Sequence, residues 1–226
     1  MSSPATLKGQ KYLRVSKLTH RSFINYVGQL RFYSYSDLLL MFIWLDADFK
    51  QIVSCSLLWF GFLVYLESVH KDNGRSRWHW SIWLSSWIAG VALLPNWFQL
   101  LFFVAAVFYA FKKYPRMGWA SPLFNGLVKA TLILTLPNGS KTSVAIVFTA
   151  MAIRNLAGDF RDAGKDFKEG IKTIPILFHY KHNTPLVYPL CLGLTSALWT
   201  WLGGLPWYAL AISWAVQALT YNWTPR

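Results

Sequence analysis

Negative charge is scarce in this chain, and so is charge of either sign. Its 226 residues include nine Asp and Glu against 22 Lys and Arg, and only 14% of the sequence is charged, whereas soluble domains carry about a quarter. Hydrophobic residues make up 54% and are spread along most of the chain. This composition excludes an ordinary soluble enzyme, and it also excludes a soluble domain held by a single membrane anchor.

Other features that the sequence lacks narrow the class of protein further. The two cysteines, Cys55 and Cys191, both lie in apolar stretches, which argues against a disulfide framework or a cysteine metal site. The first 30 residues hold no apolar run of secretory length, so we expect no cleavable signal peptide. The formal charge of +13 rests on few charged residues, so we interpret it as membrane topology and expect no nucleic-acid partner.

Eight apolar segments separated by turn-forming residues predict the fold. We expect an all-α protein, a polytopic membrane bundle of about eight transmembrane helices paired as hairpins around a central cavity. The expected helices cover residues 32–47, 50–67, 80–94, 97–111, 122–137, 142–157, 186–202 and 207–223. Residues 31–226 then form one membrane-embedded domain. Residues 1–30 form a basic cytoplasmic segment whose pattern is compatible with an amphipathic surface helix.

The basic residues predict how the helices are oriented. With this helix pattern, 19 Lys and Arg fall on the side of the two termini, and only Lys50 and Lys141 fall on the opposite side. Short cytoplasmic loops carry an excess of Lys and Arg. We therefore expect a multi-pass protein of the lipid bilayer with both termini on the cytoplasmic side.

The charged segment 154–175 is the candidate site. If the sixth helix continues through it, Asp159, Asp162 and Asp166 lie on one helix face. Carboxylate oxygens suit Mg²⁺, which binds through one or two carboxylates plus substrate phosphates. Arg154 and Lys172 are candidates to bind those phosphates. The alternative interpretation is a solvated helix end, stabilised by opposite charges one turn apart.

The aspartate spacing resembles a known motif. The pattern Asp159-x-x-Asp162-x-x-x-Asp166-x-x-x-Gly170-x-x-Thr173-x-Pro175 is similar to the second aspartate-rich motif of the UbiA superfamily of intramembrane prenyltransferases. The resemblance implies Mg²⁺-dependent ionisation of an isoprenyl diphosphate and transfer of the prenyl group to a hydrophobic acceptor, with the three aspartates as catalytic metal ligands. Terpene cyclisation starts from the same ionisation and stays open as an alternative.

The resemblance implies further site residues. The segment from Lys112 to Met117 and the helix after it look like the family's basic loop and fifth-helix entry. This implies three substrate-binding residues: Lys112, Arg116 and Asn125. At the place of the family's first acidic motif, Glu67 stands at the first Asp position and His70 at the second. The resemblance therefore assigns Glu67 to metal and substrate binding and His70 to substrate binding.

The departure from the family's first motif keeps a second class of protein open. The first motif of this chain retains only one carboxylate, as expected for a non-catalytic relative of the family. Such a protein would be an integral subunit of a larger membrane complex and would bind a quinone, pigment or lipid. We disfavour a transporter, because the sequence indicates no broken helices and no acidic residue at membrane depth away from the helix ends.

Lys129 is a cation inside an expected helix. An ammonium group at the middle of a span costs about 3 kcal/mol, so such a residue usually faces a cavity or a partner. Asn125 lies one turn earlier, and the two residues predict a polar stripe toward the bundle interior. We therefore add Lys129 to the expected catalytic residues. The alternative is a side chain that snorkels to water.

Overall fold

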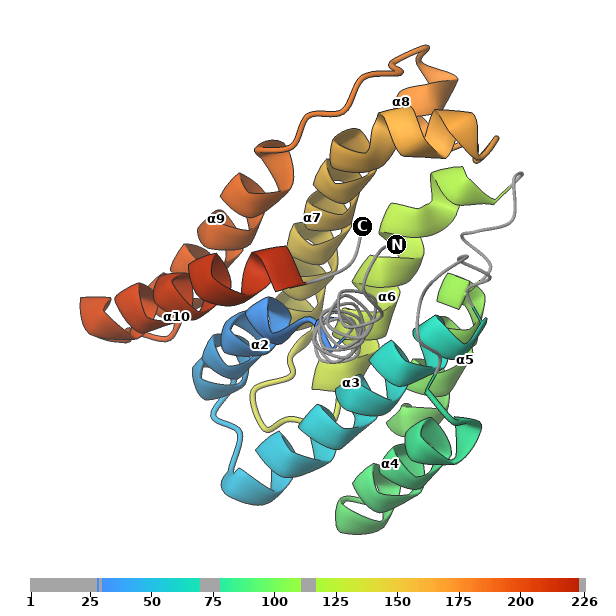
Figure 1. The fold of residues 1–226 in the computed structure, drawn as a ribbon. Coiled ribbons are helices and arrows are strands. Elements are labelled where there is room, and N and C mark those ends of the chain that lie inside the picture. The colour runs from blue at the N-terminus through green and yellow to red at the C-terminus, as the bar shows by residue number, and fades with distance from the viewer. Residues whose placement is uncertain (1–27, 29, 70–77, 111–116, 224–226) are drawn as a thin grey trace, which may run out of the picture.

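The computed structural model describes residues 28, 30–69, 78–110 and 117–223, and the regular elements of these residues are all helical (Figure 1). The described residues include eight long helices: α2 (Phe32–Trp44), α3 (Phe49–Val69), α4 (Trp80–Leu93), α5 (Phe98–Ala110), α6 (Ser121–Ile133), α7 (Lys141–Lys168), α9 (Val187–Leu202) and α10 (Trp207–Thr220). Three short helices accompany them: η2 (Gly118–Ala120), α8 (Ile174–Leu177) and η3 (Tyr221–Trp223). The all-α prediction is confirmed. The expected N-terminal segment lies outside the described residues, apart from Gly28 and Leu30.

Each expected apolar segment overlaps one of the long helices. The start of α7 is set by Ser140, whose hydroxyl accepts a hydrogen bond from the Ser143 amide at 3.1 Å and so caps the helix. The end of α7 differs from the expectation, since the helix continues to Lys168 instead of ending near residue 157. It stops before Gly170, whose φ of 70° lies in the left-handed region that glycine adopts freely. The longer α7 therefore carries all three aspartates.

Close packing follows the expected hairpins only in part. α6 packs along α7, and α9 packs on α10, but α3 packs mainly on α4, and α2 mainly on α9 and α10. Gly61 permits the α3–α4 contact, because a side chain there would lie 2.6 Å from Nε1 of Trp87. Small residues let helix backbones approach closely. The expected hairpin of α2 and α3 is therefore a chain connection with few contacts.

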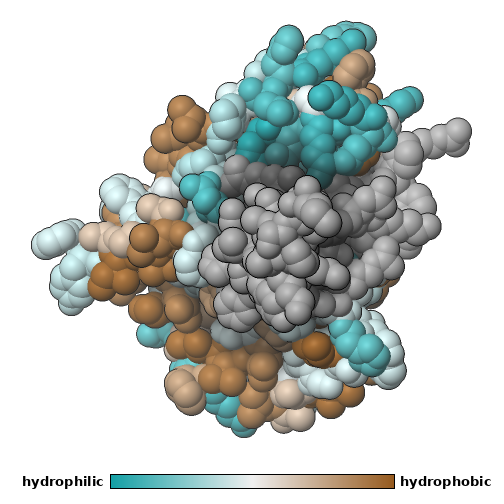
Figure 2. All heavy atoms as spheres, viewed as in Figure 1, coloured by the Kyte–Doolittle hydropathy of each residue, from teal (hydrophilic) through white to brown (hydrophobic). Residues whose placement is uncertain are grey.

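Apolar side chains also cover much of the outside of the molecule. Large hydrophobic residues are exposed on α5, α9 and α10, among them Leu100, Val104, Leu190, Leu194 and Ile212. Figure 2 shows hydrophilic residues gathered over the end of the molecule where α8 lies, and hydrophobic residues over the lower part of the same face. Two helices, α3 and α7, are long and apolar enough to cross a membrane, and α4, α5 and α9 are shorter apolar helices.

Candidate functional site

The candidate site lies at the α8 end of α7. Asp159 and Asp166 are only 8% and 7% exposed, and seven residues of helix separate them by about 10 Å along the axis. Asp162 lies at the edge of that face, where its carboxylate oxygens accept hydrogen bonds from Nε and Nη2 of Arg161 at 2.8 and 2.5 Å. The helix therefore places two of the three carboxylates on its buried side and the third in an ion pair.

The carboxylates of Asp159, Asp162 and Asp166 are not arranged to bind one metal ion together. Among the residues that the structure describes, no three His, Cys, Asp or Glu side chains lie close enough together to hold a metal. Mg²⁺ is commonly held by one or two carboxylates together with waters and phosphate oxygens. The oxygen donors of Asp159 and Asp166 fit that arrangement, with one carboxylate for each ion, and they do not fit a cage of three aspartates.

The segment after α7 folds back against the start of α6. A side chain at Gly118 would lie 2.7 Å from Cγ2 of Ile171, so glycine is needed for this close approach. Thr173 is 3% exposed, and its hydroxyl has no hydrogen-bond partner among the described residues. The neighbouring Lys172 is exposed. The turn thus brings a basic side chain and a buried hydroxyl group to the α8 end of α7.

Arg154 contacts a partner that the sequence analysis missed. Its guanidinium donates Nη1–H to Oδ2 of Asp37 at 2.5 Å and to Oγ1 of Thr195 at 3.2 Å. Asp37 is fully buried, and it lies in the middle of α2. The expectation that acidic residues lie only near the ends of the helices is therefore wrong, because Asp37 lies in the middle of one. An ionisable residue inside an apolar segment was the signal that could have found it.

The Asp37 carboxylate begins a chain of hydrogen bonds that ends in α10. Its Oδ1 accepts from the Ser196 hydroxyl of α9 at 3.2 Å, and Ser196 accepts from Nε2 of Gln217 at 2.6 Å. Gln217 also donates to the hydroxyl of Ser213 at 3.3 Å. Buried polar groups need such partners. One buried polar network thus joins α2, α7, α9 and α10.

Lys129 lies in the interior, as expected, and does not snorkel to water. It is 1% exposed, and its Nζ lies 3.4 Å from the ring centroid of Trp59 in α3, which is a cation–π contact. No hydrogen bond joins Nζ to any described residue. Asn125, one turn earlier on the same helix, is half-buried. The Lys129 amine is therefore a hydrogen-bond donor held inside the bundle.

Glu67 lies in an ion pair of its own. It is 4% exposed, and its Oε1 lies 3.5 Å from Nη2 of Arg31. Burial alone lowers the pKa of the Arg31 guanidinium, but Tyr33, Glu67, Tyr109 and Tyr188 together raise it by more, so the pKa lies above its ordinary value and Arg31 stays charged. Three expected substrate-binding residues lie outside the described part of the chain: His70, Lys112 and Arg116.

No protein-family model, no curated protein and no solved structure matches this chain. The UbiA resemblance therefore rests on the residues of the aspartate-rich segment 154–175 and the weaker likeness around residues 112–125. The function is inferred from the side chains of α7 and the helices packed against it.

Proposed function

We propose that this chain is a multi-pass membrane enzyme of the UbiA type, which takes the prenyl group from an isoprenyl diphosphate and transfers it to a hydrophobic acceptor. One observation carries the proposal: Asp159 and Asp166 lie buried on one side of α7, at the end of the helix that α8 adjoins. Carboxylates shielded from water at the mouth of an apolar bundle are suited to bind Mg²⁺ together with a diphosphate.

In this proposal the eight long helices cross a bilayer, and both termini and α8 face the cytoplasm. The 19 basic residues on that side, against two on the other, support the orientation. The exposed apolar side chains of α5, α9 and α10 support contact with lipid. α2, α4 and α5 have only 13 or 14 residues, fewer than the ~20 of an upright span, so local thinning of the bilayer accompanies them.

Asp159 and Asp166 would each hold one Mg²⁺ ion through a carboxylate oxygen, together with diphosphate oxygens and water. The ions would supply positive charge against the charge that builds up on the departing diphosphate. Lys172, exposed beside the site, adds a positive charge for the phosphate oxygens. The allylic C–O bond breaks, and its electron pair leaves with the diphosphate.

The apolar interior serves the second half of the reaction. Aromatic side chains, among them Trp59, Phe62 and Tyr109, lie in the core beside α6, and a dry surrounding keeps water from the allylic cation. The acceptor attacks the cation, a new bond to carbon forms, and the acceptor releases a proton. Lys129 is the interior donor that can bind the polar group of the acceptor.

Release of diphosphate tests this function. The purified full-length chain is incubated with Mg²⁺ and isoprenyl diphosphates of increasing chain length, with and without an aromatic acceptor, and free diphosphate is measured. We expect release that depends on Mg²⁺. Cyclisation and transfer both begin with this ionisation, and the organic product then distinguishes them.

Matched Asp-to-Asn variants locate the site. Asp159→Asn and Asp166→Asn should each lower the rate of release by about 100-fold, because each removes a ligand of the charge-neutralising ion. Asp46→Asn is the control, since Asp46 is exposed in the α2–α3 turn and its φ of 58° suits asparagine. Equal rates in all three variants would contradict the assignment of the site.

A non-catalytic binding subunit is the second candidate. Two ion pairs favour this candidate, Arg161 with Asp162 and Arg154 with Asp37, because they engage residues of the aspartate-rich segment in contacts within the protein instead of with a ligand. Such a subunit binds a quinone, pigment or lipid and co-purifies with a partner chain. Absence of diphosphate release at every chain length, together with a co-purifying partner or chromophore, selects this candidate over the enzyme.

A further inference from the structure

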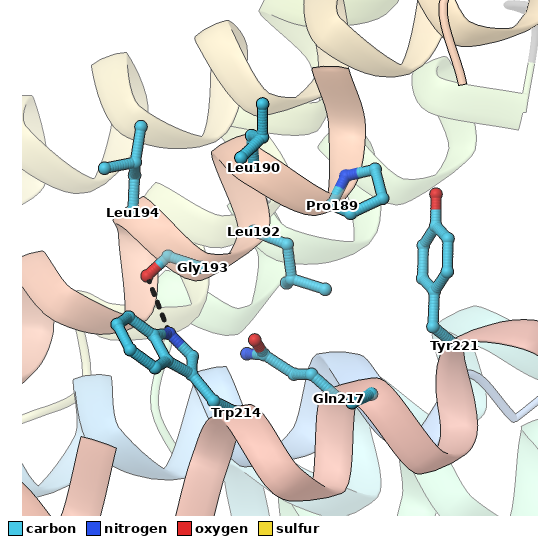
Figure 3. Close-up of a pocket in the computed structure, with 9 residues that line it drawn as sticks. Pro189, Leu190, Leu192, Gly193, Leu194, Trp214, Gln217 and Tyr221 are labelled. Carbon is cyan, nitrogen blue, oxygen red and sulfur yellow. Dashed lines mark hydrogen bonds between the residues drawn. The ribbon is translucent and has the colours of Figure 1, made fainter. Parts of the chain in front are cut away.

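A groove of about 410 Å³ runs between α9 and α10 (Figure 3). Its volume falls within the range of small-molecule sites. Apolar side chains form most of its lining, namely Pro189, Leu190, Leu192, Leu194 and Ala218. Trp214 closes one side, where its indole N–H donates to the carbonyl of Gly193 at 3.2 Å. The groove is thus shaped to hold a hydrocarbon chain.

Two polar side chains, Gln217 and Tyr221, also line the groove, and the Tyr221 hydroxyl accepts a hydrogen bond from Nη1 of Arg161 at 3.3 Å. Gln217 is 6% exposed, and in Figure 3 its side chain extends from α10 toward α9. Both of its hydrogen bonds to described residues use Nε2, which donates to Ser196 at 2.6 Å and to Ser213 at 3.3 Å. These bonds fix the amide plane and leave Oε1, which accepts no hydrogen bond from a described residue, at the groove. An amide oxygen is a hydrogen-bond acceptor, so this position can accept a hydrogen bond from a ligand in the groove.

We infer that the α9–α10 groove binds a long-chain alcohol, whose hydrocarbon chain lies against Leu190, Leu194 and Trp214 and whose hydroxyl donates to Oε1 of Gln217. A saturated lipid chain alone would fill the apolar part of the groove but would leave the amide oxygen without a donor. A hydroxyl group supplies that donor, and it is small enough to lie among apolar side chains. The inference does not depend on diphosphate chemistry.

Quenching of tryptophan fluorescence tests the inference, because Trp214 lines the groove. The full-length chain in detergent is titrated with a dibrominated octadecanol and, as the matched probe, with the methyl ether of the same alcohol, which has no hydroxyl donor. The Trp214→Phe variant isolates the signal of Trp214 from the other tryptophans. We expect the alcohol to bind about fivefold to tenfold more tightly than the ether. Equal affinities would overturn the inference.

Two variants separate the hydrogen bond from the apolar groove. Gln217→Leu should abolish the preference for the alcohol over the ether, because it removes the acceptor. Ala218→Phe should abolish Trp214 quenching by both probes, because Ala218 is exposed and lines the groove, so that a larger side chain fills it without disturbing the core. Ala215→Phe, on the same helix outside the groove lining, is the control and should bind like wild type. Trp214 quenching that persists in Ala218→Phe, or a preference that persists in Gln217→Leu, would overturn the inference.

Discussion

Two regions of this molecule hold their helices together in different ways. α3 and α4 meet through glycine and tryptophan: Gly61 lies under Trp87, whose indole donates to the Leu58 carbonyl at 3.1 Å. α2, α7, α9 and α10 meet through the buried network around Asp37 and Arg154. In the proposed bilayer, lipid would give helices no hydrophobic reason to associate, so close packing and polar contacts would remain to hold them together. The comparison indicates that close packing, with hydrogen bonds to backbone carbonyls, joins α3 and α4, whereas a network of charged and polar side chains joins the other four helices.

The largest effect should come from breaking the charged pair. Arg154→Met leaves the buried Asp37 carboxylate without its cation, and we expect a loss of about 3 to 5 kcal/mol in the free energy of unfolding. Denaturation by SDS in mixed micelles, followed by circular dichroism, measures it. The double variant Asp37→Leu/Arg154→Met removes both charges and should recover most of the loss. A double variant as unstable as the single one would show that packing, and not the uncompensated charge, is responsible.

A smaller effect should come from breaking the close contact of α3 and α4. Gly61→Ala places a methyl group within 3 Å of the Trp87 ring, and we expect overpacking to cost about 2 kcal/mol. The same denaturation measures it. Gly193→Ala is the matched control, since the nearest atom to its added methyl lies at 3.4 Å. Equal stability of the two variants would contradict the role assigned to Gly61.

The smallest effect on stability should come from Lys129, a buried side chain that forms no ion pair with any residue that the structure describes. Lys129→Met removes an amine that lies over the Trp59 ring and makes no hydrogen bond to a described residue, and we expect stability within about 1 kcal/mol of wild type. If Lys129 serves a ligand, the variant should instead weaken binding of the acceptor's polar group, as measured by the Michaelis constant for the acceptor. A loss of stability as large as that of Arg154→Met would show that Lys129 is structural.

The aspartate segment shows which features of the candidate site the sequence pattern predicts and which it does not. The spacing predicts Asp159, Asp162 and Asp166 on one helix face, and the structure buries Asp159 and Asp166 but not Asp162. The partner of Asp162 is its chain neighbour Arg161, and spacing alone does not show whether a carboxylate turns to a neighbour or to a ligand. The end of α7 was placed too early, because the charged residues after residue 157 interrupt the apolar pattern without interrupting the helix.

The sequence by itself determined where the helices lie, since apolar runs and turn residues are local properties of the chain. It also determined the uneven distribution of basic residues. Only the tertiary structure decided which helices adjoin and which charges meet. Arg154 and Asp37 are 117 residues apart in the chain, and an apolar pattern records that a residue is buried but not which residue it is buried against. Identities of neighbours follow from the packing of all the helices together.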